Sequence, residues 1–90
     1  MRSEHDFFHL AMRAVTENPM LFVDDSLRLK LTNPDFDISF ESLEMDSLSR
    51  MEMAIWLELE LGIEISEAKI QELGSLVGLR NFLRTALSKA

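Results

Sequence analysis

Hydrophobic residues recur at helical spacing near the N-terminus of the chain. The recurring positions are Phe7, Phe8, Ala11, Met12, Ala14 and Val15. This spacing predicts an amphipathic helix, which should begin near Ser3, because Asp6 three residues later completes a weak capping signature. The helix should end at Asn18, because the residue before a proline disfavours the helical region and Pro19 follows.

A second helix is predicted from Asp46 to about Leu61. Asp46 is a favoured N-cap residue, and Gly62 can end the helix in a left-handed conformation. Apolar residues form a stripe along this helix at Leu48, Met51, Ile55 and Leu59, and Met53, Trp56 and Leu57 widen it. We expect this apolar face to lie against the core.

Two further helices are predicted in the C-terminal third. Ser66 can cap a short helix from Glu67 to Leu73, which Gly74 would end. Ser75 can cap a last helix, which runs from about Leu76 to Leu87. Its expected inward-facing residues are Leu76, Leu79, Phe82, Leu83 and Leu87.

Residues 19–45 form a long connection between the first two of these helices. Leu27, Leu29 and Leu31 alternate with polar residues, as in a strand, but a lone strand has no pairing partner in so short a chain. A short helix or a packed extended segment is therefore preferred for Leu27–Leu31. The apolar residues that should anchor the connection to the core are Phe36, Ile38, Phe40 and Leu43.

These elements predict one all-α domain over residues 1–90. We expect a small four-helix bundle, made of three main helices and one short helix, with a long first loop.

The chain has 90 residues, a formal charge of −7 and no cysteine. The lack of cysteine excludes a disulfide framework and a thiolate metal site. The acidic residues are concentrated: residues 35–67 contain ten acids and a single base, Arg50. Such a chain is a poor binder of nucleic acid and suits a partner with a basic surface.

No apolar run approaches the roughly 20 residues that span a bilayer, and no signal segment is apparent, so a cytoplasmic protein is expected.

Little in the sequence points to catalysis or to a metal site. His5 and His9 are four residues apart, but two ligands without a third do not make a zinc site. Two histidines, no cysteine and no tyrosine supply little general acid–base chemistry. We therefore expect neither an enzyme nor a metal ion at these positions.

Asp35-x-Asp37-x-Ser39 is similar to the opening of a calcium-binding loop. The sixth position of such a loop requires glycine and holds Phe40, and the twelfth, normally a bidentate glutamate, is Asp46. A calcium site is therefore not expected.

Asp46-Ser47-Leu48 stands at the start of the predicted acidic helix. Ser47 would be the first helical residue, with its hydroxyl beside unpaired backbone N–H groups at the positive end of the helix dipole. A phosphate ester on this hydroxyl would be stabilised there. An ordinary Asp cap followed by a polar residue would have the same sequence.

The surrounding residues distinguish this tripeptide from an ordinary cap. They read Phe40-x-x-Leu43-x-x-Asp46-Ser47-Leu48-x-x-Met51-Glu52-Met53, then Leu57-Glu58-x-x-Leu61-Gly62-Ile63-x-Ile65, and finally Ser75-Leu76-x-x-Leu79-x-x-Phe82-Leu83. In order and spacing this pattern resembles the acyl carrier protein family.

The resemblance implies a helical bundle whose Ser47 is modified with 4′-phosphopantetheine by a separate phosphopantetheinyl transferase. Asp46 and Leu48 flank this attachment site and are included in the cofactor-binding set. The terminal thiol of the arm holds acyl groups as thioesters, which accounts for thiol chemistry in a chain without cysteine. The further partners implied are an acyl-loading ligase or synthase and acyltransferases.

The resemblance also implies a docking surface for basic patches on partner enzymes. Asp46, Glu52 and Glu58 occupy matching positions, and Arg50 would mark the same surface. The apolar interior can shelter an acyl chain, and Met51 and Met53 would either adapt to it or pack the core.

Several residues depart from the family pattern. Glu44 stands where a glycine is usual, Trp56 is bulky where small residues are common, and the segment Leu27–Leu31 lengthens the first connection. These departures favour a specialised carrier. We expect it to be free-standing and monomeric, with fatty acyl, polyketide or aminoacyl cargo left open. The alternative is an unmodified helical interaction module that binds a basic partner through its acidic helix.

Overall fold

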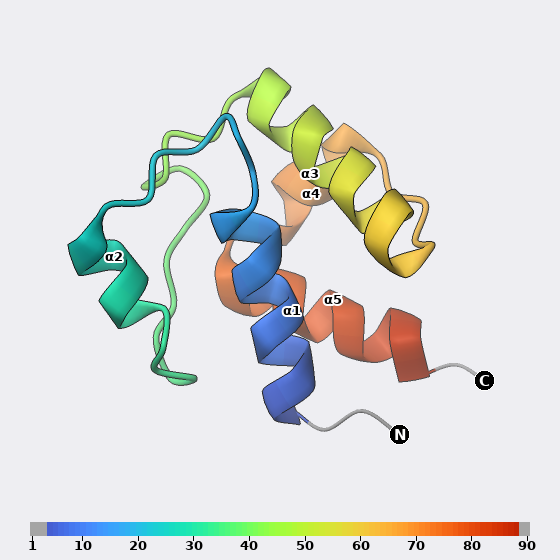
Figure 1. Ribbon diagram of the computed structural model, residues 1–90. Coiled ribbons are helices and arrows are strands. Elements are labelled where there is room, and N and C mark those ends of the chain that lie inside the picture. Colours follow the sequence, from blue (N-terminus) through green and yellow to red (C-terminus); the bar gives the residue numbers. More distant parts are fainter. Residues whose placement is uncertain (1–3, 89–90) are drawn as a thin grey trace.

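Helices supply the regular secondary structure of the protein, as the sequence predicts. The computed structural model describes residues 4–88, and side chains from residue 6 onward. Its helices are α1 (Glu4–Thr16), α2 (Asp25–Lys30), α3 (Ser47–Leu61), α4 (Glu67–Leu73) and α5 (Leu76–Ser88), as Figure 1 shows. The all-α class is confirmed. Helix α2 shows that the first of the two alternatives for Leu27–Leu31, a short helix, is correct, and it adds a fifth helix to the predicted four.

The ends of α3 and α4 follow their sequence signals. Asp46 caps α3, and the Ser66 side chain caps α4 by accepting a hydrogen bond from the backbone N–H of Lys69 at 3.1 Å. Gly62 and Gly74 end the two helices in the left-handed conformation, with φ of 69° and 74°, which glycine adopts without steric cost. The predicted cap at Ser3 lies outside the described residues.

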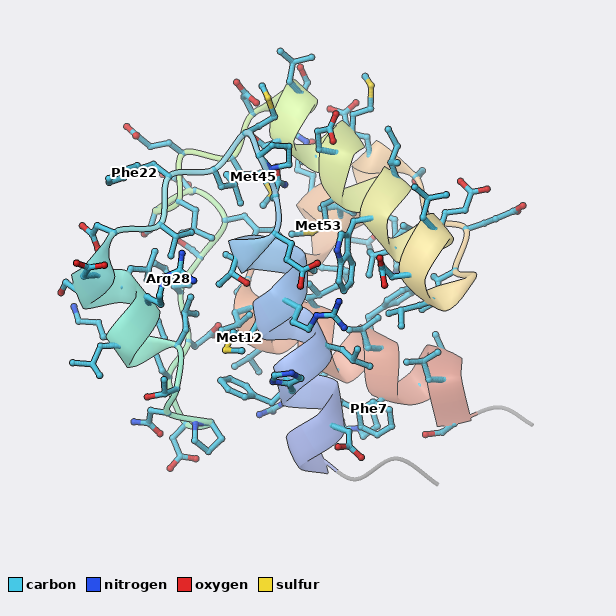
Figure 2. The ribbon with its side chains drawn as sticks, viewed as in Figure 1. Phe7, Met12, Phe22, Arg28, Met45 and Met53 are labelled. Atoms are coloured by element: carbon cyan, nitrogen blue, oxygen red, sulfur yellow. The ribbon has the colours of Figure 1, made fainter. Side chains whose placement is uncertain are left out.

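The core lies where α1, α3, α4 and α5 meet. Helix α1 packs along α5 and against α3, and α4 joins α3 to α5. Figure 2 shows Met53 in the interior between α1 and α3. The core side chains without exposed surface include Val15, Met53, Leu57, Ile70, Leu76, Leu79 and Leu83.

The apolar stripe predicted to face the core from α3 faces solvent instead. Leu48, Met51, Ile55 and Leu59 are 56%, 49%, 43% and 79% exposed, and the residues buried on this helix are Ser49, Met53 and Leu57. The predicted apolar face is right for Met53 and Leu57 and wrong for the stripe. Helix α3 is apolar on two faces, so periodicity alone does not determine which face turns inward.

Polar contacts at two points along α3 fix this rotation. Near the N-terminal end, Asn18 Nδ2 donates a buried hydrogen bond of 2.9 Å to the Ser49 carbonyl. Further along, Trp56 Nε1 donates to Glu17 Oε1 at 2.9 Å, and the Arg13 guanidinium lies 5.3 Å from the Trp56 ring centroid. The bulky Trp56 thus belongs to the seam between α1 and α3.

The long first connection is anchored to the junction of α4 and α5. Phe40 is buried, and its N–H donates to the Gly74 carbonyl at 2.8 Å, while the Leu76 N–H donates to the Ile38 carbonyl at 3.0 Å. Phe36 and Leu43 pack against the core, so the expected anchors are confirmed. Helix α2 lies to one side of the bundle (Figure 1).

Within residues 4–88, none of the helices combines the length and the hydrophobicity that crossing a membrane requires.

Candidate functional site

Ser47 is the first residue of α3, and its side chain is exposed. Its hydroxyl makes no hydrogen bond to another described residue. The helix that it begins has 15 residues, so the positive end of a full helix dipole lies beside the hydroxyl. This arrangement fits a phosphate ester, because the first backbone N–H groups of a helix favour an anion.

Asp46 holds the first turn of α3 in place. Its Oδ1 accepts two hydrogen bonds of 2.9 Å from Ser49, one from the backbone N–H and one from the hydroxyl. These bonds, first that of the backbone and then that of the hydroxyl, lower the pKa of Asp46 from its ordinary value. Asp46 is therefore a charged cap, and it orients the turn that presents Ser47.

The loop before Ser47 is tied to the same part of the bundle. The Met45 N–H donates to the Phe40 carbonyl at 3.0 Å. Arg50 reaches back to the Met45 carbonyl at 3.3 Å and forms an ion pair with Glu67 of α4 at 3.0 Å. These contacts tie the loop before Ser47 to the start of α3 and, through Arg50, to α4.

Glu44 occupies a strained position in this loop. Its φ is 57°, and it is the one residue other than glycine with a positive φ among residues 4–88. The left-handed region costs an L-residue with a Cβ roughly 1–2 kcal/mol. A glycine at this place would avoid the strain, and this chain keeps the conformation with a glutamate.

The residues predicted for docking are placed on α3 and at its start. Glu58 is exposed and Glu52 is half-buried. Both lie beside the solvent-facing residues Leu48, Met51, Ile55 and Leu59, which we call the apolar stripe. Arg50 differs from them, because its guanidinium faces Glu67.

The candidate metal residues are not brought together. Asp37 Oδ1 accepts from the backbone N–H of Ile38 and from that of Val77, each at 2.9 Å, and Ser39 donates to Ser42. The His5 side chain lies outside the described residues, so of His5 and His9, which are not expected to form a zinc site, only His9 is described. No group of three or more metal-ligating side chains occurs in the described part of the chain.

Three residues make structural contacts that the sequence does not predict for them. Ser49 and Asn18 link Asp46 to the end of α1, and Asp37 caps α5 across 40 residues of sequence. Asn18 is recognisable in the sequence only as the residue before Pro19. A Ser three residues after an Asp cap is a local signal that could have identified Ser49.

The comparison with protein families identifies the fold around Ser47. The model of the phosphopantetheine attachment site family matches residues 24–83, which include all of α2, α3 and α4 and the start of α5. No match was found among curated proteins or among solved structures. The chain belongs to the phosphopantetheine attachment site family, whose members are carrier domains that hold 4′-phosphopantetheine covalently and work with synthases and transferases.

Proposed function

We propose that Ser47 carries the phosphopantetheine arm and that the protein presents acyl groups to partner enzymes as thioesters on it. The observation that carries this proposal is the exposed Ser47 hydroxyl at the start of α3, inside the region that matches the family. When attached, the arm supplies the thiol that the chain lacks. The chain itself performs no catalysis in this proposal.

Attachment needs one bond exchange at Ser47. The Ser47 Oγ attacks the phosphorus of coenzyme A that bears the pantetheine, and the bond to the nucleotide phosphate breaks. A phosphodiester forms on Oγ, 3′,5′-adenosine bisphosphate leaves, and a base of the transferase takes the serine proton. Asp46 keeps its hydrogen bonds to Ser49, so the first turn of α3 stays ordered beside the new anion.

The apolar stripe with Glu52 and Glu58 is the docking face in this proposal. Large apolar side chains exposed together on one helix are typical of interaction sites, and four of them line α3. Asp46 lies at one end of the stripe, and Glu52 and Glu58 flank it. A partner that fits this face would have an apolar patch with basic residues around it.

A small hollow next to the stripe supports a basic partner. It has a volume of about 150 Å³, and its lining includes Pro19, Ile55, Leu59 and Glu52. Glu17 also lines it but is already paired with Arg13 at 2.7 Å, so Glu52 is the carboxylate that a partner would meet. An arginine or lysine of the partner combines an aliphatic stem with a charged end and would suit both kinds of wall. Arg50, also predicted for docking, would act at the α4 edge of this face through its contact with Glu67.

Intact mass after incubation with coenzyme A and a broad-specificity phosphopantetheinyl transferase tests the proposal. We expect the mass to increase by one arm in the wild type and in Ser26→Ala, which alters an exposed serine elsewhere, and no increase in Ser47→Ala. The circular dichroism spectrum of Ser47→Ala should remain that of a folded, helical protein. No increase in the wild type with several transferases would contradict the carrier role and would support the unmodified interaction module.

A further inference from the structure

The buried polar residues among those described are Asn18 and Ser49, and they contact each other. Asn18 is 4% exposed and Ser49 is 2% exposed, in a core of apolar side chains. Asn18 Nδ2 donates to the Ser49 carbonyl at 2.9 Å, and Asn18 Oδ1 accepts from the backbone N–H of Met20 at 2.9 Å. Each end of the amide thus has a partner of the matching kind, as a buried polar side chain requires. These two bonds fix the orientation of the amide.

Hydrophobic burial alone does not select the observed rotation of α3. The buried face of this helix holds Met53 and Leu57 together with Ser49, whereas the apolar stripe holds four large apolar residues. On an ideal helix the middle of the stripe lies roughly 155° from the buried face. A rotation that turned the stripe inward would bury all four of its side chains, so apolar burial also favours a second rotation of α3.

The hydrogen bond from Asn18 to Ser49 distinguishes the two rotations. Turning the stripe inward would carry Ser49 away from Asn18 and leave the buried amide without its acceptor. A buried donor without a partner bears the full cost of its desolvation. The other polar contact, from Trp56 to Glu17, is exposed, so water can replace it. The buried bond is therefore the stronger selector, as a buried asparagine is for the register of a coiled coil.

The rotation of α3 also determines where Ser47 lies. Ser47 and Ser49 belong to the first turn of the same helix, and Asp46, which precedes Ser47, accepts the N–H and the hydroxyl of Ser49. A change of rotation would therefore move Ser47 around the helix axis while it buried the apolar stripe. The attachment site and the proposed docking face would then no longer be presented together.

We propose that Asn18 is a positioning residue for modification of Ser47, and that it acts through Ser49 by holding α3 in the rotation that presents Ser47 and the apolar stripe. The proposal rests on the attachment at Ser47. Asn18 is buried, so it does not itself meet the transferase. Its role is to select one of two packings, and its loss should permit the second rotation without unfolding the chain.

Two methionines of α3 report its rotation. Met51 is 49% exposed and Met53 has no exposed surface, and positions two residues apart differ by roughly 200° around a helix. Oxidation by hydrogen peroxide, followed by peptide mapping, measures the rate at each methionine. In the wild type, Met51 should oxidise much faster than Met53. In Asn18→Leu, oxidation of Met51 should become several-fold slower and that of Met53 several-fold faster.

Leu83→Ala is the control for lost stability. Leu83 lies on α5 and has no exposed surface, so this variant opens more often but keeps the rotation of α3. It should accelerate the oxidation of Met53 and leave that of Met51 unchanged. If Asn18→Leu gives the same result as Leu83→Ala, the proposal is overturned.

Asn18→Asp separates the two contacts of Asn18. Its ionised carboxylate still accepts from Met20 but has no donor for the Ser49 carbonyl. We expect the same change in methionine oxidation as in Asn18→Leu, and wild-type rates would overturn the role of the contact with Ser49. Failure of both variants to fold would also overturn the proposal, because a residue that only selects a rotation is not required for folding.

A second-site change tests the competing rotation. Ile55 and Leu59 are exposed members of the stripe, and Ile55→Gln/Leu59→Gln makes this face too polar to be buried. Added to Asn18→Leu, the pair should restore the slow oxidation of Met53 and the fast oxidation of Met51. A rate pattern that stays as in Asn18→Leu would contradict the proposal.

The kinetics of arm transfer measure the functional consequence. Only molecules in the presenting rotation bind the transferase, so in Asn18→Leu and Asn18→Asp the KM for the protein should rise several-fold while kcat is retained. Folded Leu83→Ala should keep both constants, and a lower kcat at an unchanged KM in the Asn18 variants would overturn the proposal. If the wild type itself gains no arm, the proposed function fails. The methionine rates, which need no transferase, then decide alone whether Asn18 holds the rotation.

Discussion

One carboxylate oxygen of Asp46 accepts both the backbone N–H and the hydroxyl of Ser49, each at 2.9 Å. Ser49 is 2% exposed and its carbonyl is bonded to Asn18 at the end of α1. The start of α3, and with it Ser47, is therefore coupled to α1 through Ser49.

This coupling predicts that Asp46 makes the free energy of unfolding depend on pH. Hydrogen bonds from Ser49 lower the pKa of Asp46 in the folded protein. Because the folded pKa is lowered, the stabilisation by Asp46 is fully present above about pH 5, where an unfolded carboxyl group is already ionised. It is lost as the pH falls through the folded pKa. Asp46→Asn keeps an acceptor oxygen but does not titrate.

Urea unfolding of both proteins between pH 7 and pH 2 measures this contribution. We expect the stability of the wild type relative to Asp46→Asn to decrease as the pH falls below about 5. The comparison cancels the titration of other carboxyls, such as Glu17, whose pKa is lowered by its hydrogen bond from Arg13. A difference that stays constant over the whole pH range would show that Asp46 is not held as described.

The rotation of α3 makes a second prediction from two neighbouring leucines. Leu57 has no exposed surface, and Leu59 is 79% exposed. Leu57→Ala should lower the free energy of unfolding by about 2–5 kcal/mol, whereas Leu59→Ala should change it by less than about 0.5 kcal/mol. Urea unfolding measures both changes. Similar losses in the two variants would mean that Leu59 is buried, as the sequence pattern alone suggests.

The same pair of leucines shows what the sequence determines and what it does not. Helix ends follow from local chemistry, so Asp46, Gly62, Ser66 and Gly74 identify α3 and α4 correctly. Local chemistry does not determine the rotation of a helix that is apolar on two faces. That rotation depends on contacts between residues far apart in the sequence, such as the one from Asn18 to Ser49.

The candidate site likewise has one part that the sequence predicts and another that it does not. The position of Ser47 at the start of an acidic helix can be predicted, because an N-cap and the residue after it are a local pattern. The ion-pair partner of Arg50 cannot be predicted, because Glu67 lies 17 residues away on α4.

Glu44 provides a third prediction. Its φ of 57° costs roughly 1–2 kcal/mol for a residue with a Cβ, while a glycine there loses about 0.5–1 kcal/mol through greater freedom in the unfolded chain. Glu44→Gly should therefore stabilise the protein by about 0.5–1 kcal/mol in urea unfolding. Glu44→Gln removes the charge but keeps the strain, and should not stabilise.

Glu41 is the matched control for this change. It is an exposed glutamate in the same loop, and its φ is not positive. Glu41→Gly should be neutral or destabilising, because it adds unfolded-state entropy and relieves no strain. Equal stabilisation by both glycines would show that the effect does not come from the left-handed conformation of Glu44.

The docking face gives the last prediction, which concerns the rate of association. Glu52 and Glu58 lie beside the exposed apolar stripe of α3, and acidic residues around a docking site mainly accelerate encounter with a basic partner. Glu52→Lys/Glu58→Lys should lower kcat/KM for transfer of the arm to Ser47 by about tenfold or more at low ionic strength. The effect should diminish as salt is added, because screening shortens the range of the charges to about 8 Å at physiological ionic strength. Asp25→Lys/Asp35→Lys makes the same change of net charge at two exposed positions, the first residue of α2 and the loop that follows α2. Helix α2 lies away from α3 in Figure 1. An equal loss in this control would indicate that net charge, rather than the face formed by α3, governs recognition by the transferase.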